Sequence, residues 1–152
     1  NPDGIRWLRA MRADLNGSSR RKVQLMLESC TIAYLQTVTL TIDSQLAESL
    51  NERTIDGVPL KEMPTVIINE LEQRTRATLD LKYELTMASL NDLRWDRIRS
   101  LEKAAIDIGY SNFPNMVWDI WELDGHSVLK ECDLIVKVFH QHYMERVSTP
   151  PL

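Results

Sequence analysis

The residues of this chain best suited to holding a metal ion are its three histidines, His126, His140 and His142. A structural zinc site needs four ligands arranged as a tetrahedron. Side chains two residues apart on a helix point roughly 200° away from each other, so His140 and His142 cannot face one ion. The sequence therefore predicts no metal site and indicates surface histidines.

Two cysteines, Cys30 and Cys132, are the candidate nucleophiles. Each lies on an apolar stripe with helical spacing, where a thiol behaves as a small apolar group and stays protonated. We expect both thiols to be buried and reduced, as in an intracellular protein, with a disulfide between them as the alternative. The serines coincide with expected helix caps, so no nucleophile stands beside an obvious base.

Carboxylates that could serve as a general acid and base are concentrated in one segment, where they alternate with basic residues. The acidic members are Asp92, Asp96, Glu102 and Asp107, and the basic members are Arg94, Arg97, Arg99 and Lys103. This alternation is typical of a solvated helix face with ion pairs between neighbouring turns. No Walker-type loop, GxGxxG, HExxH or EF-hand loop occurs. The sequence predicts neither an enzyme nor a bound cofactor.

A basic segment opens the chain. Residues 1–22 hold six basic and two acidic side chains, a balance of +4, and the net charge of −4 therefore leaves −8 for residues 23–152. Arg20, Arg21 and Lys22 form the candidate site for contact with phosphate or an acidic partner, beside the simpler interpretation of a solvated helix start. Just upstream, the spacing by three of Arg6, Arg9 and Arg12 predicts a basic ridge on the face opposite an apolar stripe. We expect the fold to survive alanine at Arg20, Arg21 and Lys22, because exposed charges contribute little to stability.

Trp118 and Trp121 lie three residues apart in the densest aromatic group of the chain. In one interpretation their short helix closes one end of a helical bundle. In the other, part of the pair is exposed and anchors a partner protein, because tryptophan is common at binding hot spots. Both interpretations remain open at this point.

The elements that must position these residues are helices. The chain has 152 residues, of which 43% are hydrophobic, and only five glycines and six prolines. Those glycines and prolines fall between segments in which apolar residues recur at intervals of three and four. The expected helices cover about 5–15, 19–52, 64–88, 92–108, 113–123 and 127–147, with a loop at 53–64. The sequence predicts an all-α bundle of six or seven helices in one domain, residues 1–152, cut from a longer polypeptide.

Segment 19–52 is the longest of these helices, and as one straight rod it would span ~51 Å. A compact chain of this length is only about 38 Å across. We therefore expect either a bend at Thr37–Ser44, where threonine hydroxyls can bond back to the preceding turn, or a protruding helix that pairs with a second copy. Residues 37–42 are also β-branched and alternate with period two, so a strand is the competing interpretation.

The functional expectation follows from long helices with apolar stripes and from the lack of chemical motifs. No run of 18 uncharged apolar residues is present, so we expect no membrane span. We expect a protein-interaction or self-association (dimerisation) domain of a larger intracellular regulatory or scaffold protein, cytoplasmic or nuclear, with a protein partner or itself as a homodimer. The alternative is a helical nucleic-acid-binding module that uses the basic segment. No small-molecule substrate is expected.

Overall fold

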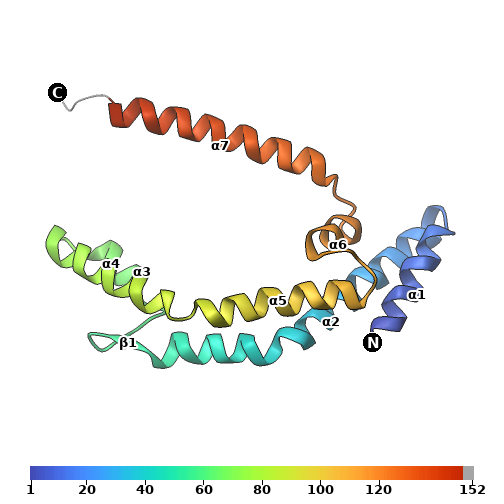
Figure 1. Ribbon diagram of the computed structural model, residues 1–152, viewed down its shortest axis with the longest axis horizontal. Helices are drawn as coiled ribbons and strands as arrows, with labels where there is room; N and C mark the ends of the chain where they lie inside the picture. The colour runs from blue at the N-terminus through green and yellow to red at the C-terminus, as the bar shows by residue number, and fades with distance from the viewer. Residues whose placement is uncertain (149–152) are drawn as a thin grey trace.

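The computed structural model describes residues 1–148, with side chains described through His140. This part of the chain forms helices and one short β-hairpin, so the all-α prediction is confirmed (Figure 1). The elements in chain order are α1 (Pro2–Ala13), α2 (Gly17–Glu52), β1 (Thr54–Ile55), β2 (Val58–Pro59), α3 (Met63–Asn69), α4 (Gln73–Ala88), α5 (Asn91–Asp107), α6 (Phe113–Ile120) and α7 (Gly125–Ser148).

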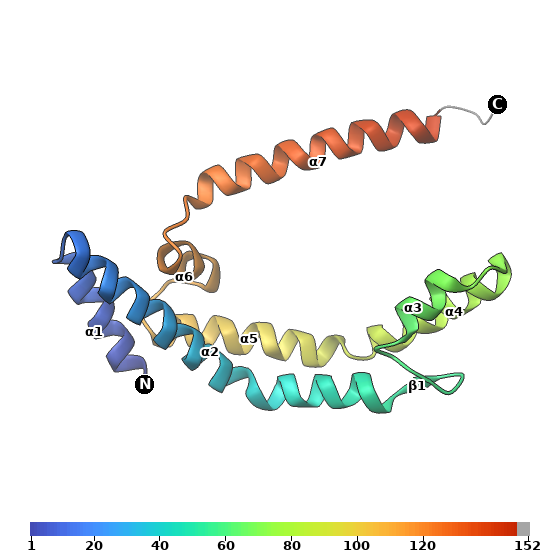
Figure 2. The same cartoon turned by 180° about the vertical axis from the view of Figure 1, so that it is seen from behind.

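The fold is elongated around a pair of helices. Helix α5 runs along α2, while α1 folds back on the first half of α2 and α6 packs beside it. Helices α3 and α4 lie at the far end of the α2–α5 pair. Helix α7 leaves this body beside α6 and runs, apart from it, along the direction of the α2–α5 pair toward the α3–α4 end, as Figures 1 and 2 show from opposite sides.

Helix α2 is continuous across the threonine run, so the strand interpretation was wrong. Its buried residues recur every four positions from Val23 to Thr39 and pack against neighbouring helices, which favours the helix over local strand propensity. Both views show the helix changing direction part-way along its length. In this region the hydroxyls of Thr37 and Ser44 donate to the carbonyl oxygens four residues earlier, both over 2.8 Å. Such bonds bend helices, in agreement with the bend expected there.

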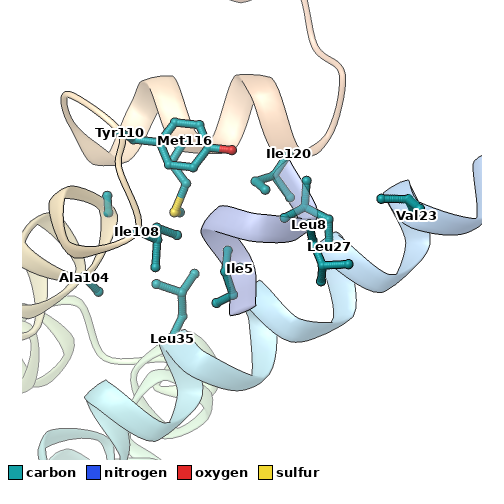
Figure 3. Close-up of a cluster of buried hydrophobic side chains, with 11 residues drawn as sticks. Ile5, Leu8, Val23, Leu27, Leu35, Ala104, Ile108, Tyr110, Met116 and Ile120 are labelled. Atoms are coloured by element: carbon teal, nitrogen blue, oxygen red, sulfur yellow. The ribbon is translucent and has the colours of Figure 1, made fainter. Parts of the chain in front are cut away.

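Two separate hydrophobic clusters hold the body together. The first joins α1, the first half of α2, the end of α5 and α6 around Leu27 and Ile108, which are fully buried (Figure 3). The second joins the end of α2, the hairpin, α3, α4 and the start of α5 around Leu60, Met63 and Leu90. The stripe of α2 is covered in turn by α1, α6 and α5. It is therefore not the free surface through which this helix was expected to pair with a second copy.

Local signals placed most of the helix boundaries correctly. Asp56 and Gly57 have φ angles of 51° and 84° and turn the β1–β2 hairpin, as their sequence predicted. Pro64 lies in the first turn of α3, and α4 ends just before the break expected at Ser89. The sequence did not predict the additional break at Glu70–Glu72 between α3 and α4, because that segment contains neither glycine nor proline.

Helix α2 contains an 18-residue window with a mean hydropathy of 1.3, of which 22% is buried. By length and composition this helix could cross a membrane, although the sequence-based expectation was that none would. A single helix of this kind is weak support for a membrane span, because core helices of soluble proteins meet the same criteria. The helix is compatible with a soluble protein.

Candidate interaction surface

A buried polar network fixes α1, α2 and α6 relative to one another. The Arg12 guanidinium donates to both carboxylate oxygens of Asp119 over 2.7 Å each and to the Asp119 carbonyl oxygen over 3.1 Å. It also donates to Oε1 of Gln24 over 2.8 Å, and Nε2 of Gln24 donates to the carbonyl oxygen of Ile120. Since Arg12 and Gln24 are buried, these bonds satisfy groups that would otherwise be costly to remove from water.

Asp119 is the centre of this network. Tyr110 donates its hydroxyl to Oδ2 of Asp119 over 2.6 Å. Partial burial alone would raise the pKa of Asp119, but the hydrogen bonds from Tyr110 and Arg12 and the nearby positive charges hold that pKa below its usual value. Burial and the hydrogen bond to this carboxylate raise the pKa of Tyr110. The pair is therefore an ionised carboxylate and a neutral phenol, and through Arg12 it joins α6 to α1.

The basic ridge predicted on α1 is largely occupied within the chain. Besides buried Arg12, Arg9 stacks over the Tyr110 ring at 3.9 Å and donates to the carbonyl oxygen of Gly109 over 2.7 Å. Arg6 pairs with Asp3 over 2.8 Å on the surface. The expectation of a solvated ridge was therefore wrong for Arg12, because its charge is neutralised by a carboxylate 107 residues further along the chain.

Of the three candidate phosphate-binding residues, one forms an ion pair with another residue of the chain. Arg20 pairs with Glu122 over 2.6 Å. Arg21 and Lys22 are exposed, and within the described residues neither forms an ion pair. The structure therefore leaves two of the three candidate cations available at the start of α2.

An apolar groove of about 680 Å³ runs between α1 and α2. Its walls are formed mainly by apolar residues, and Trp7 and Met26 on its rim are 61% and 54% exposed. Cys30 also lines the groove and is exposed, so the expectation that this thiol is buried was wrong. The groove could not be predicted from the sequence, because it arises where α1 folds back across α2.

Helix α7 carries a second apolar surface, which we call the α7 face. Its residues are Val128, Leu129, Cys132, Ile135, Val136 and Phe139. At 100° per residue these positions cluster on one side of the helix, and all six are exposed. The expectation that Cys132 is buried was wrong, and Phe139, whose helical spacing from Cys132 would place it in the same core, is exposed too, because α7 packs against no other helix along this stretch. Tyr143 and Val147, placed on the same stripe, have side chains outside the described residues.

The two tryptophans of α6 have different surroundings. Trp118 is half-buried and packs directly on Gly125, where a Cβ would lie 2.3 Å from the indole ring. Trp121 is 39% exposed. Trp118 therefore makes a structural contact at the α6–α7 junction. The cap of α7 is Asp124 rather than the expected Ser127, since Asp124 accepts hydrogen bonds from the backbone N–H groups of His126 and Ser127.

Among the described residues, no group of three or more metal-ligating side chains is close enough to hold an ion. His126 and His140 are exposed surface residues, whereas the side chain of His142 lies outside the described part. No protein-family model, no protein of curated function and no solved structure matches this chain. Its function must therefore be argued from its own surfaces.

Proposed function

We propose that this chain is a self-association domain, in which two copies cover apolar surface that one copy leaves in water. The observation that carries the proposal is the exposed area. A compact monomer of 17.6 kDa exposes about 7,900 Å² by the size scaling of folded proteins, whereas this chain exposes 11134 Å². The surplus of roughly 3,200 Å² is larger than the area, about 800 Å² per partner, that a standard interface buries.

The composition of the exposed surface supports the same proposal. Exposed large hydrophobic side chains occur over much of the chain and are dense on α7, where Leu129, Ile135 and Phe139 are more than half exposed. Trp7 on the rim of the α1–α2 groove is more than half exposed as well. Contiguous apolar surface of this kind is uncommon on monomeric soluble proteins and marks interaction sites. A two-fold dimer is the commonest closed arrangement that buries it.

The nucleic-acid alternative has less support than the sequence suggested. Arg9, Arg12 and Arg20 are engaged with acidic or aromatic groups of the chain itself, so the contiguous positive surface reduces to Arg21 and Lys22 with the outer part of α1. Two such cations are too few to account for strong phosphate-driven binding. Free thiols at Cys30 and Cys132 suit a reducing compartment, which supports an intracellular role within a larger regulatory or scaffold protein.

Light scattering coupled to size exclusion tests this proposal with a matched pair of variants. Ile135 on the α7 face and its neighbour Leu134 are 54% and 62% exposed, but they point to different sides of α7. We expect Ile135→Asp to lower the mass from near twice 17.6 kDa to 17.6 kDa and Leu134→Asp to leave the dimer intact. Loss of the dimer in both variants, or in neither, contradicts an interface on the α7 face, and a monomeric parent chain contradicts self-association itself.

A further inference from the structure

We infer that α7 of one copy docks in the α1–α2 groove of a second copy, and that the second copy returns its own α7 in exchange. This inference rests on the self-association proposed above and specifies the two surfaces that meet. In each chain the α7 face is not covered by any groove of that chain, and the α1–α2 groove is not filled by any helix of that chain. Docking an amphipathic helix into an apolar groove is a common way of burying both.

The two surfaces agree in length. The groove follows α2 from Met26 to Thr37, and the α7 face runs from Val128 to Phe139. Both stretches contain twelve residues, which corresponds to about 18 Å at the rise of an α-helix. They also agree in character, since the groove is lined almost wholly by apolar side chains and the α7 face has none that is charged.

The α7 helix of the same chain points the wrong way to fill the groove. In Figures 1 and 2, α7 begins beside α6 and runs away from α1. Its starting direction is held by Trp118 of α6, whose ring lies against Gly125. Turning α7 toward the groove of its own chain would break this contact, whereas a second copy supplies the helix without breaking it.

Reciprocal exchange also doubles the contact between the two copies. In a two-fold dimer each chain buries one α7 face and one groove, so the same contact is made twice. A standard interface buries about 800 Å² per partner, and making the contact twice brings the dimer closer to that area than one contact would. A dimer formed through a single pair of α7 helices would leave both grooves in water.

The positions of the two cysteines allow this arrangement to be tested by crosslinking. Cys30 lines the groove and Cys132 lies on the α7 face, and both thiols are exposed and free. Each is the fifth residue of its twelve-residue stretch. Docking α7 in either direction therefore places Cys132 of one copy within about one helical turn of Cys30 of the other.

Crosslinking with a short bis-maleimide tests the inference on the full chain. Two variants, Cys30→Ser and Cys132→Ser, are treated separately and as an equimolar mixture. We expect a crosslinked dimer in the mixture and at least a five-fold lower yield in either variant alone. A peptide map of the product should join the peptide of Cys30 to that of Cys132. Adding Ile135→Asp to both chains should abolish the product.

The other outcomes overturn the inference in distinguishable ways. A dimer crosslinked in Cys30→Ser alone shows α7 paired with α7, and self-association then stands without the exchange. A Cys30–Cys132 link within a monomer of the parent chain shows that the groove is filled by its own α7. A dimeric mass without any crosslink rejects the docking mode alone. A mass of 17.6 kDa at all concentrations rejects both this inference and the proposed function.

Discussion

Removal of the Arg12 guanidinium should destabilise the body of the protein more than any exposed charge does. Arg12 makes two bonds of 2.7 Å to the Asp119 carboxylate and one of 2.8 Å to Gln24. Breaking a fully buried ion pair costs 3–5 kcal/mol, but the Asp119 side chain is 36% exposed and water recovers part of that loss. We expect Arg12→Ala to lower the free energy of unfolding by about 2–3 kcal/mol.

Urea unfolding followed by circular dichroism measures this effect, and a double-mutant cycle with Asp119→Asn isolates the pair. We expect the two substitutions to be non-additive by about 1–2 kcal/mol. The matched control is Arg99→Ala, which removes an arginine bonded over 2.7 Å to Asp96 on the open face of α5 and should cost less than about 0.5 kcal/mol. Additive effects in the cycle, or equal losses for Arg12→Ala and Arg99→Ala, would refute the role assigned to the network.

The same carboxylate gives the stability a defined pH dependence. Because the pKa of Asp119 is lowered in the folded chain, its contribution is complete above the ordinary aspartate pKa of about 4 and is lost as the pH falls through the lower folded value. Asp43 adds to this loss, since hydrogen bonds from Thr39 and Arg97 lower its pKa as well. We expect stability to decline below pH 4 and the decline to be shallower in Asp119→Asn. If Asp119→Asn loses stability below pH 4 as steeply as the parent chain does, folding does not stabilise the ionised carboxylate.

Three further substitutions test the packing. Leu27→Ala removes a fully buried side chain and should cost about 3–5 kcal/mol, measured by urea unfolding; a loss below 1 kcal/mol would place Leu27 outside the core. Thr31→Val should stabilise the chain by about 1 kcal/mol in the same assay, because the Thr31 hydroxyl is buried and bonds to no described residue; destabilisation would indicate a bound partner. Gly125→Ala should shift the fluorescence of Trp118 to longer wavelength, because the new Cβ would lie 2.3 Å from the ring; an unchanged spectrum would mean that the two residues are not in contact.

Periodicity and turn chemistry predicted the helices, because both are local. Asp56-Gly57 permits left-handed backbone, and Pro64 suits a first turn, so each marks a boundary whatever the rest of the fold does. The break at Glu70–Glu72 has no such residue and was missed. The threonine run at residues 37–42 was ambiguous. Its local propensity favours a strand, whereas burial of Thr39, and of Thr31 two turns earlier, against other helices favours a helix.

The candidate surfaces could not be predicted, because an apolar stripe does not say what covers it. The stripes of α2 and α7 have the same spacing, yet Leu27 is buried beneath α1 and α6 while Phe139 is 71% exposed. The ion pair between Arg12 and Asp119 could not be predicted either, because Asp119 lies far along the sequence in a helix of eight residues. Long-range pairing of this kind depends on how the helices are arranged, and one sequence carries no direct signal of it.

Sedimentation equilibrium of the unmodified chain, from nanomolar to tens of micromolar concentration under reducing conditions, tests the central claim most directly. Self-association through surface left exposed by the monomer predicts a mass that rises with concentration and levels off near twice 17.6 kDa. A mass of 17.6 kDa across the whole range would contradict the claim and would mean that the α7 face and the groove remain in water in the isolated chain.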